Sequence, residues 1–227
     1  MSIIDLRYAL FGTNTPTYTP SNLAGSITPS HEVYMAVLKK AIKDFTPVEK
    51  IALEEIPVNE CIQLDLAFFG IGLNRCKDFK EQLAFIERNA TRATSWMTTD
   101  FVNQFFKKPK FETWAPFFER MVKTEGEFSR RFAYGTALLF YKDRRCFDLV
   151  SKHLAKDERY YTMMMEAWLL ANFAIYFPDE VYAILDSEQL TLPCRRKTVS
   201  KMCDSYRITQ EHKDRAKALR LKWKAKS

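Results

Sequence analysis

A tryptophan and an aspartate stand four residues apart in the stretch Ser95–Phe101, which reads Ser-Trp-Met-Thr-Thr-Asp-Phe. Residues at positions i and i+4 of a helix share one face, so Trp96 and Asp100 are predicted to serve one small volume. An electron-rich indole ring beside a carboxylate is suited to binding a cation. The structural alternative for the same pair is a core tryptophan and a solvated aspartate on an ordinary helix.

Other kinds of chemistry have little support in the sequence. The five cysteines are scattered and form no CxxC pair, and together with three isolated histidines they offer no zinc spacing and no visible Cys–His dyad. No glycine-rich phosphate loop occurs, so nucleotide hydrolysis is not indicated. We therefore expect reduced, mostly buried thiols, with no metal and no cofactor.

Positive charge is concentrated at one end of the chain. The net charge is +7, and residues 191–227 hold twelve Lys and Arg against three acids, so the rest of the chain is slightly acidic. A basic end on a near-neutral body is typical of a surface that faces a polyanion such as nucleic acid. A solvated terminal helix would have the same composition, and the sequence leaves both interpretations open.

The elements that must position these residues are predicted to be helices. Residues 1–30 form an extended or irregular segment after a short first helix, because turn-forming residues crowd the stretch from Gly12 to Pro29. Apolar residues recur at helical spacing in nearly all of the remaining chain. The predicted helices cover residues 30–45, 48–56, a stretch starting at Pro57, 77–90, 95–101, 111–123, 127–142, 145–154, 159–177, 179–185, 193–206 and 210 onward.

This succession of helices with short links predicts an all-α fold. We expect residues 31–227 to form one HEAT-like helical-repeat domain, a solenoid of antiparallel helix pairs, although no sequence repeat of fixed period accompanies it. Helix 159–177 is nearly all apolar and is predicted to be buried between its neighbours. No apolar run approaches the length of a membrane span and no signal pattern opens the chain, so a cytoplasmic protein without a membrane partner is expected.

Four stretches stand out when they are taken in order along the chain. They are a Trp-x-x-x-Asp motif at Trp96, an Arg-Arg-x-Ala motif at Arg130, an Ala-Trp motif within Met163–Leu170, and Tyr176–Val181 followed by a tail that includes Lys197–Ile208 and Lys213. Together, and in this order, they resemble the DNA alkylation repair family of HEAT-like-repeat DNA glycosylases, the AlkD-like proteins. The likeness extends over most of the chain, from about Tyr34 to Leu219.

The resemblance implies a superhelix of helix pairs with a concave basic face, which binds duplex DNA containing alkylated bases as a monomer. The implied reaction is hydrolysis of the N-glycosidic bond of cationic N3- or N7-alkylated purines, with the base left stacked in the duplex. Asp100 would stabilise the positive charge that builds on the deoxyribose, and Trp96 and Trp168 would cradle the cationic base. The residues expected to bind DNA are Arg131, with Arg130 as the weaker candidate for the same role, and Lys107, Lys108, Lys110, Arg195, Arg196 and Lys197.

Two non-enzymatic functions compete with this hypothesis. A HEAT-like protein that binds DNA or a protein partner without catalysis is the first alternative. A scaffold whose basic tail binds an acidic protein is the second. Release of free alkylpurine separates the glycosylase from both, and binding to DNA at low salt separates the two alternatives from each other.

Overall fold

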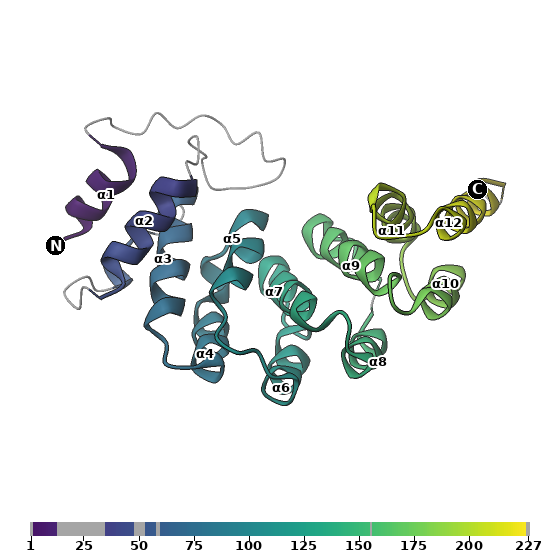
Figure 1. Ribbon diagram of the computed structural model, residues 1–227, viewed down its shortest axis with the longest axis horizontal. Coiled ribbons are helices and arrows are strands. Elements are labelled where there is room, and N and C mark those ends of the chain that lie inside the picture. Colours follow the sequence, from purple (N-terminus) through teal and green to yellow (C-terminus); the bar gives the residue numbers. More distant parts are fainter. Residues whose placement is uncertain (1, 13–34, 48–52, 58–59, 155, 226–227) are drawn as a thin grey trace. The chain divides into compact units, whose positions relative to one another are not determined.

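The chain is all-helical throughout the part that the structure describes. The computed structural model describes residues 2–12, 35–47, 53–57, 60–154 and 156–225, and these contain twelve α-helices, four short 3-10 helices and no β-strand (Figure 1). The predicted all-α class is therefore confirmed. The chain divides into two compact units, Met1–Phe117 (unit 1) and Phe118–Ser227 (unit 2). Within the described ranges, no helix combines the length and the apolar character needed to cross a membrane.

Unit 1 is organised around one buried helix. Its helices are α1 (Ile3–Phe11), α2 (Met35–Phe45), α3 (Ile62–Arg75), α4 (Phe79–Asn89), α5 (Trp96–Phe101) and the first part of α6 (Phe111–Met121), with the 3-10 helices η1 (Leu53–Glu55), η2 (Ala90–Arg92) and η3 (Val102–Phe105). Every residue of α3 from Ile62 to Leu73 is buried. Helices α2, α4 and α5 and the 3-10 helix η3 pack against α3, which therefore forms the core of the unit.

Local signals account for most helix starts in unit 1. Ser2 and Asp5 form a capping box at α1, and Asp78 caps α4 by accepting a hydrogen bond from Glu81 N (2.9 Å). The prediction that a helix starts at Pro57 is wrong. Helix α3 starts at Ile62, because the backbone of Cys61 is extended. The helix predicted for residues 48–56 is described only from residue 53, where η1 forms, and residues 48–52 and 13–34 lie outside the described residues.

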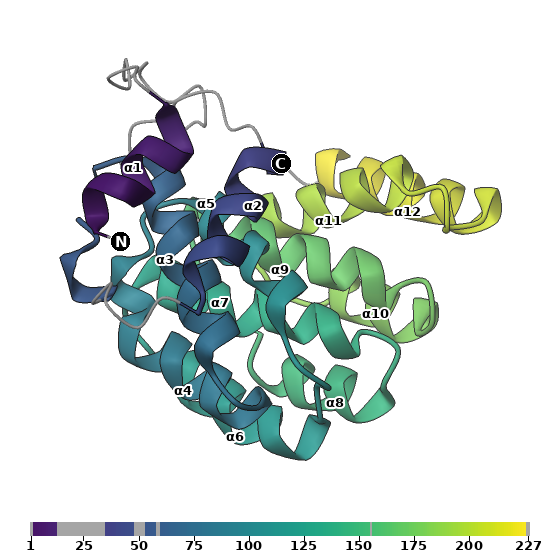
Figure 2. The ribbon, with the colours of Figure 1, turned by 60° about the vertical axis from the view of Figure 1, so that its left-hand side comes forward.

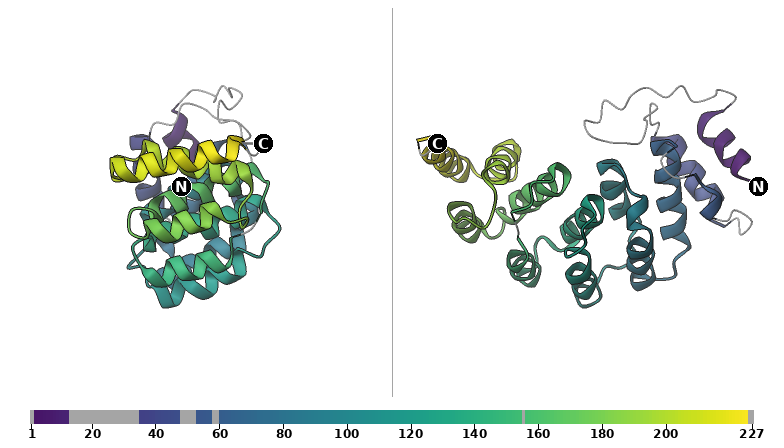
Figure 3. Two further views of the ribbon diagram at one scale, coloured as in Figure 1. Left: turned by 90° about the vertical axis from the view of Figure 1, so that its right-hand side faces the viewer. Right: turned by 180° about the vertical axis from the view of Figure 1, so that it is seen from behind.

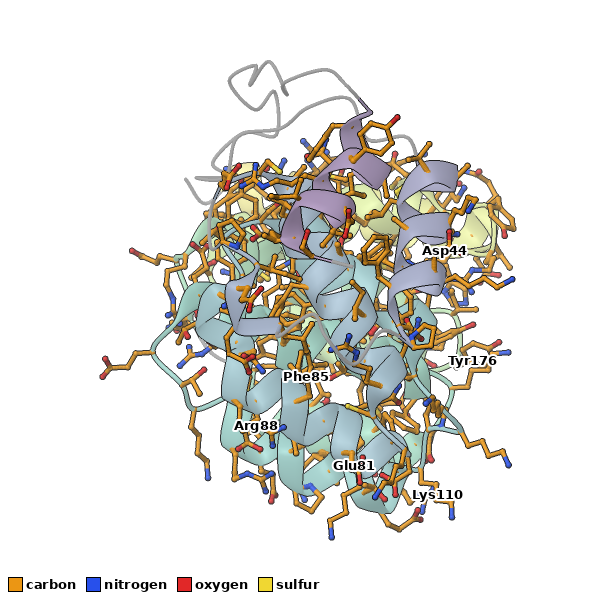
Figure 4. The ribbon with its side chains drawn as sticks, turned by 90° about the vertical axis from the view of Figure 1, so that its left-hand side faces the viewer. Asp44, Glu81, Phe85, Arg88, Lys110 and Tyr176 are labelled. Atoms are coloured by element: carbon orange, nitrogen blue, oxygen red, sulfur yellow. The ribbon has the colours of Figure 1, made fainter. Side chains whose placement is uncertain are left out.

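The close packing of α3 against α4 depends on Gly72. A Cβ atom at this position would lie 2.1 Å from Cζ of Phe85, which is labelled on α4 in Figure 4. Alanine normally stabilises a helix relative to glycine, but here the added methyl group would force the two helices apart. We expect Gly72→Ala to lower the free energy of unfolding in urea by about 1–3 kcal/mol.

A second change tests the cause of that loss. Replacing Phe85 by Leu removes the ring atoms that the added methyl group would meet. The variant that carries both Gly72→Ala and Phe85→Leu is expected to be more stable than the sum of the two single effects predicts. Additive effects in this double-mutant cycle would contradict a steric contact between the two positions.

Unit 2 consists of two layers of helices. Its helices are α7 (Glu127–Ala137), α8 (Arg144–Lys152), α9 (Tyr160–Phe173), α10 (Pro178–Asp186), α11 (Leu192–Asp204) and α12 (Gln210–Ala225), with the 3-10 helix η4 (Leu138–Phe140). Helices α7, α9 and α11 form one layer, and α8, α10 and α12 form the other (Figures 2 and 3). Helix α9 packs on both α7 and α11 and buries most of its residues, as predicted, although it ends at Phe173 instead of Phe177.

Candidate functional site

The tryptophan–aspartate pair lies on α5, as its spacing predicts. Ser95 is buried and caps the helix by accepting a hydrogen bond from Met97 N (3.2 Å). Thr98 and Thr99 are fully buried, whereas Trp96 and Asp100 are both partly exposed. Because α5 packs against α3, its buried threonines fix which side of the helix turns outward. This arrangement is consistent with an indole ring and a carboxylate on one accessible side of unit 1.

Thr99 connects the two ends of this pair. Its hydroxyl group donates a hydrogen bond to the carbonyl oxygen of Trp96 (2.9 Å) and lies 3.3 Å from Oδ1 of Asp100. A buried hydroxyl group in this position limits the rotation of the carboxylate without neutralising it. Asp100 can therefore stabilise a cation that approaches from the exposed side of α5.

The basic segment after η3 contains three exposed lysines, of which Lys107 is anchored by hydrogen bonds. Nζ of Lys107 donates to the carbonyl oxygens of Asn74 (3.0 Å) and Cys76, and its backbone N–H donates to Oε1 of Gln82 (2.8 Å). Lys107 therefore caps the C-terminal end of α3, where a cation is favourable. Because the ammonium group of Lys107 is engaged in this way, the exposed Lys108 and Lys110 are better placed to contact phosphate.

Arg131 lies inside unit 2. Only 5% of its surface is exposed, and its Nη1 donates a hydrogen bond to the carbonyl oxygen of Tyr161 in α9 (2.7 Å). The resemblance implies a surface contact between this arginine and a DNA phosphate. The geometry instead uses its guanidinium group to link α7 to α9, and a phosphate contact would require the side chain to leave the interior.

Arg130 also makes an internal ion pair, at the edge of the same helix. Its Nη1 lies 2.8 Å from Oδ2 of Asp157, and Arg159 binds the same carboxylate (2.6 Å). Burial alone would raise the pKa of Asp157, but its hydrogen bonds with Arg159 and Arg130 outweigh that effect and hold the pKa below its ordinary value. The three side chains together fasten the start of α7 to the loop that precedes α9.

The lowered pKa of Asp157 predicts how stability depends on pH. A carboxyl group whose pKa is lower in the folded state adds stability above its unfolded pKa of about 3.9, and that stability is lost as the pH falls through the folded value. We expect Asp157→Asn to lower the unfolding free energy at pH 7 and to weaken its decline on acidification to about pH 3. Urea unfolding across this range measures both effects, and Asp186→Asn, which removes an exposed carboxylate, is the control. Equal acid sensitivity of wild type and Asp157→Asn would contradict this role.

Trp168 is exposed in the middle of α9, a helix that is otherwise mostly buried. It is 38% exposed, whereas its neighbours Ala167 and Leu169 are fully buried. The ring borders a hollow of about 360 Å³ between α9 and the end of α11, and Nζ of Lys201 lies 5.8 Å from the ring centre. An ammonium group at that distance is within the range of a cation–π contact. The indole ring is therefore accessible and lies in a cationic setting.

The basic residues at the start of α11 differ in accessibility. Nη1 of Arg195 donates to the carbonyl oxygen of Ser187 (3.2 Å), and its guanidinium carbon lies 5.3 Å from the ring centre of the buried Trp223. Arg195 therefore contributes to the packing of α11 on α12. Arg196 is partly exposed and Lys197 is exposed, so these two remain accessible to a polyanion.

Most of the cysteines are buried thiols. All five are free, as expected, and Cys61, Cys146 and Cys194 are buried. Burial raises the pKa of Cys61 to about 11, and it raises the pKa values of Cys146 and Cys194 further above their ordinary range. Among the described residues, no three His, Cys, Asp or Glu side chains gather as the ligands of a metal ion would.

The predicted site residues thus lie in both units. Unit 1 brings together Trp96 and Asp100, and unit 2 contains Arg130, Arg131 and Trp168. The expectation that all of them line one concave face stays a prediction.

Comparisons with protein families, with curated proteins and with solved structures find no match to this chain. The geometry of the site and the chemistry of its residues are therefore what a functional proposal can rest on.

The hollow beside Trp168 contains residues of the stretch Lys197–Ile208 to which the sequence analysis assigned no individual role. Lys201, Asp204, Tyr206 and Arg207 line it together with Trp168. In the sequence, a tyrosine followed by an arginine just after a basic helix is only a weak indication of a binding site. The fold strengthens it by bringing both residues next to Trp168. The sequence could not show that the end of α11 returns to the exposed ring of α9.

Proposed function

We propose that the protein is a DNA repair glycosylase that hydrolyses the N-glycosidic bond of cationic N3- or N7-alkylated purines in duplex DNA. In this proposal the helix pairs form a HEAT-like superhelix whose concave basic face holds the duplex. The observation that carries the proposal is the outward-facing pair of Trp96 and Asp100 on the capped helix α5.

The chemistry needs few groups because the substrate is already activated. When the bond between C1′ and the alkylated base breaks, its electron pair leaves with the base and cancels the positive charge of the ring. The sugar becomes an oxocarbenium-like cation, and a water molecule then adds at C1′ and loses a proton. The carboxylate of Asp100 stabilises the sugar cation and positions the water. No acid is required to protonate the leaving base.

The indole rings contribute to recognition of the charged base. A cation over an indole face gains about 0.5–2 kcal/mol, depending on how far both groups are desolvated. Trp96 is partly exposed and Trp168 is exposed, so both rings are accessible to a ligand. The backbone contacts are assigned to the exposed Lys108, Lys110 and Lys197, while Arg131 links α7 to α9 within unit 2.

The direct test is release of free alkylpurine. Duplex DNA treated with a methylating agent is incubated with the protein, and the supernatant is analysed for 3-methyladenine and 7-methylguanine by chromatography. The glycosylase proposal expects release by the wild-type protein above the spontaneous rate. Binding of the same duplex without any release would refute it.

A non-enzymatic DNA-binding protein is the second candidate. It is favoured by one observation: Arg130 and Arg131, the arginines expected to clasp DNA at the reaction site, are both engaged within unit 2. A protein that only binds DNA could rely on its exposed lysines and would not need an arginine at a fixed phosphate. Binding that is strong at low salt, insensitive to methylation and accompanied by no release would support this candidate.

A further inference from the structure

The hollow between α9 and the end of α11 combines two aromatic rings with two cations. Trp168 borders it with an exposed ring, and Tyr206, in the turn after α11, is 92% exposed. Trp and Tyr combine a large apolar ring with a polar group and are enriched at binding interfaces. The volume of the hollow, about 360 Å³, falls in the range of sites that bind small ligands.

The cations of the hollow are held in place by neighbouring side chains. Arg207 donates from Nη2 to Oδ1 of Asn172 and from Nη1 to the hydroxyl oxygen of Tyr141 (3.0 Å). Its guanidinium carbon also lies 5.4 Å from the centre of the Tyr141 ring. Nζ of Lys201 lies over the ring of Trp168. The ammonium group of Lys201 and the guanidinium group of Arg207 therefore both border the hollow.

One carboxylate limits the charge that the hollow can accept. Asp204 lines it and forms no ion pair with the other described residues. Two cations and one anion leave a net charge of +1, which matches the single negative charge of a phosphodiester better than a polyphosphate. A carboxylate oxygen can also accept a hydrogen bond from an amino group of a nucleobase.

We propose that this hollow binds an unpaired nucleotide of a nucleic-acid strand. Its base contacts Trp168 and Tyr206, and its phosphodiester lies at Lys201 and Arg207. Stacking platforms beside a cationic groove are the general means by which proteins bind single strands. Paired bases within a duplex offer no free face to the two rings, so this activity goes beyond binding of duplex DNA and does not require the chemistry of Asp100.

The test is equilibrium binding of a fluorescein-labelled deoxythymidine 12-mer, measured by anisotropy at several salt concentrations. Tyr206→Ala and Trp168→Ala are each expected to raise the Kd by about five- to a hundredfold, the range for loss of one stacking ring, with an unchanged salt slope. Lys201→Gln and Arg207→Gln are expected to raise the Kd and to reduce the salt slope by up to about 0.7, the value for one phosphate of a single strand.

Matched controls separate the hollow from general charge and aromatic effects. Lys152→Gln removes an exposed lysine of α8, and Tyr8→Ala removes an exposed tyrosine of α1; both should bind the 12-mer as the wild type does. Thermal melting of each variant checks that its fold is intact.

Three outcomes would overturn the proposal. The first is wild-type affinity in both aromatic variants. The second is equal loss of affinity in the control variants. The third is competition by inorganic phosphate as effective as competition by unlabelled 12-mer, which would show a simple anion site. Loss of alkylpurine release with retained 12-mer binding would count against the glycosylase alone.

Discussion

Asp100→Asn is expected to reduce the release of alkylpurine from methylated duplex DNA by at least about a hundredfold, while leaving duplex binding intact. Removing one preorganised group that stabilises charge in a transition state typically costs a factor of about 10²–10³. The amide keeps the size of the carboxylate and can still accept a hydrogen bond from Thr99, so α5 should retain its structure. The substitution removes only the negative charge that the proposed mechanism places opposite the sugar cation.

The measurement is single-turnover release of 7-methylguanine, with duplex affinity determined in parallel. Loss of a negative charge beside a polyanion should leave the affinity equal or slightly higher. Asp186→Asn provides the matched control, because it makes the same chemical change on an exposed residue of α10. Release by Asp100→Asn at the wild-type rate would remove Asp100 from the mechanism. A loss shared by Asp186→Asn would show a general effect instead.

Much of the helical order follows from local sequence. The apolar period placed α4 and α5 to within about two residues, and the structure shows that Asp78 and Ser95 cap these helices, a signal that acts within one turn. The same reasoning misplaced the start of α3. Proline suits the first turn of a helix, yet a helix starts only where the backbone turns helical, and Cys61 is extended.

The sequence predicted the candidate site only where its residues lie close together along the chain. Trp96 and Asp100 share a helix, so their spacing was informative. The burial of Arg131 depends on the carbonyl oxygen of Tyr161, thirty residues away, and no pattern in α7 indicates that partner. The hollow beside Trp168 likewise depends on where the chain turns after α11. Such contacts between distant segments are set by packing, which composition and periodicity do not encode residue by residue.

Arg131 provides the sharpest contrast between the sequence-based role and the structural one. Helix α7 is buried along most of its length, and Arg131 reaches α9 from within it. Helix α9 also buries a carboxylate, Glu166, which is 1% exposed. After burial itself, the charge of Glu166 is the next cause that raises the pKa values of Tyr134 in α7 and Cys194 in α11. The layer of helices that contains Arg131 thus buries several polar side chains. Buried polar groups require hydrogen-bond partners within the protein.

Arg131→Ala is therefore expected to lower the free energy of unfolding by about 2–3 kcal/mol, because a hydrogen bond from a charged donor is worth about 1.5–3 kcal/mol and the packing of its stem is lost as well. Urea unfolding followed by circular dichroism measures the loss. Arg130→Ala is the matched comparison: Arg130 is partly exposed and Arg159 still binds Asp157 without it, so a loss of no more than about 1 kcal/mol is expected.

The clasp role implied by the family resemblance leads to the opposite pattern. An arginine that neutralises one phosphate should, on removal, leave stability unchanged and reduce the salt slope of duplex binding by about 0.9. A stable Arg131→Ala protein with a reduced salt slope would therefore show that the side chain leaves the interior to bind DNA. If Arg131→Ala is destabilised and its folded fraction keeps the wild-type salt slope of duplex binding, Arg131 has a structural role. The exposed Lys108, Lys110 and Lys197 would then account for the contacts with the DNA backbone.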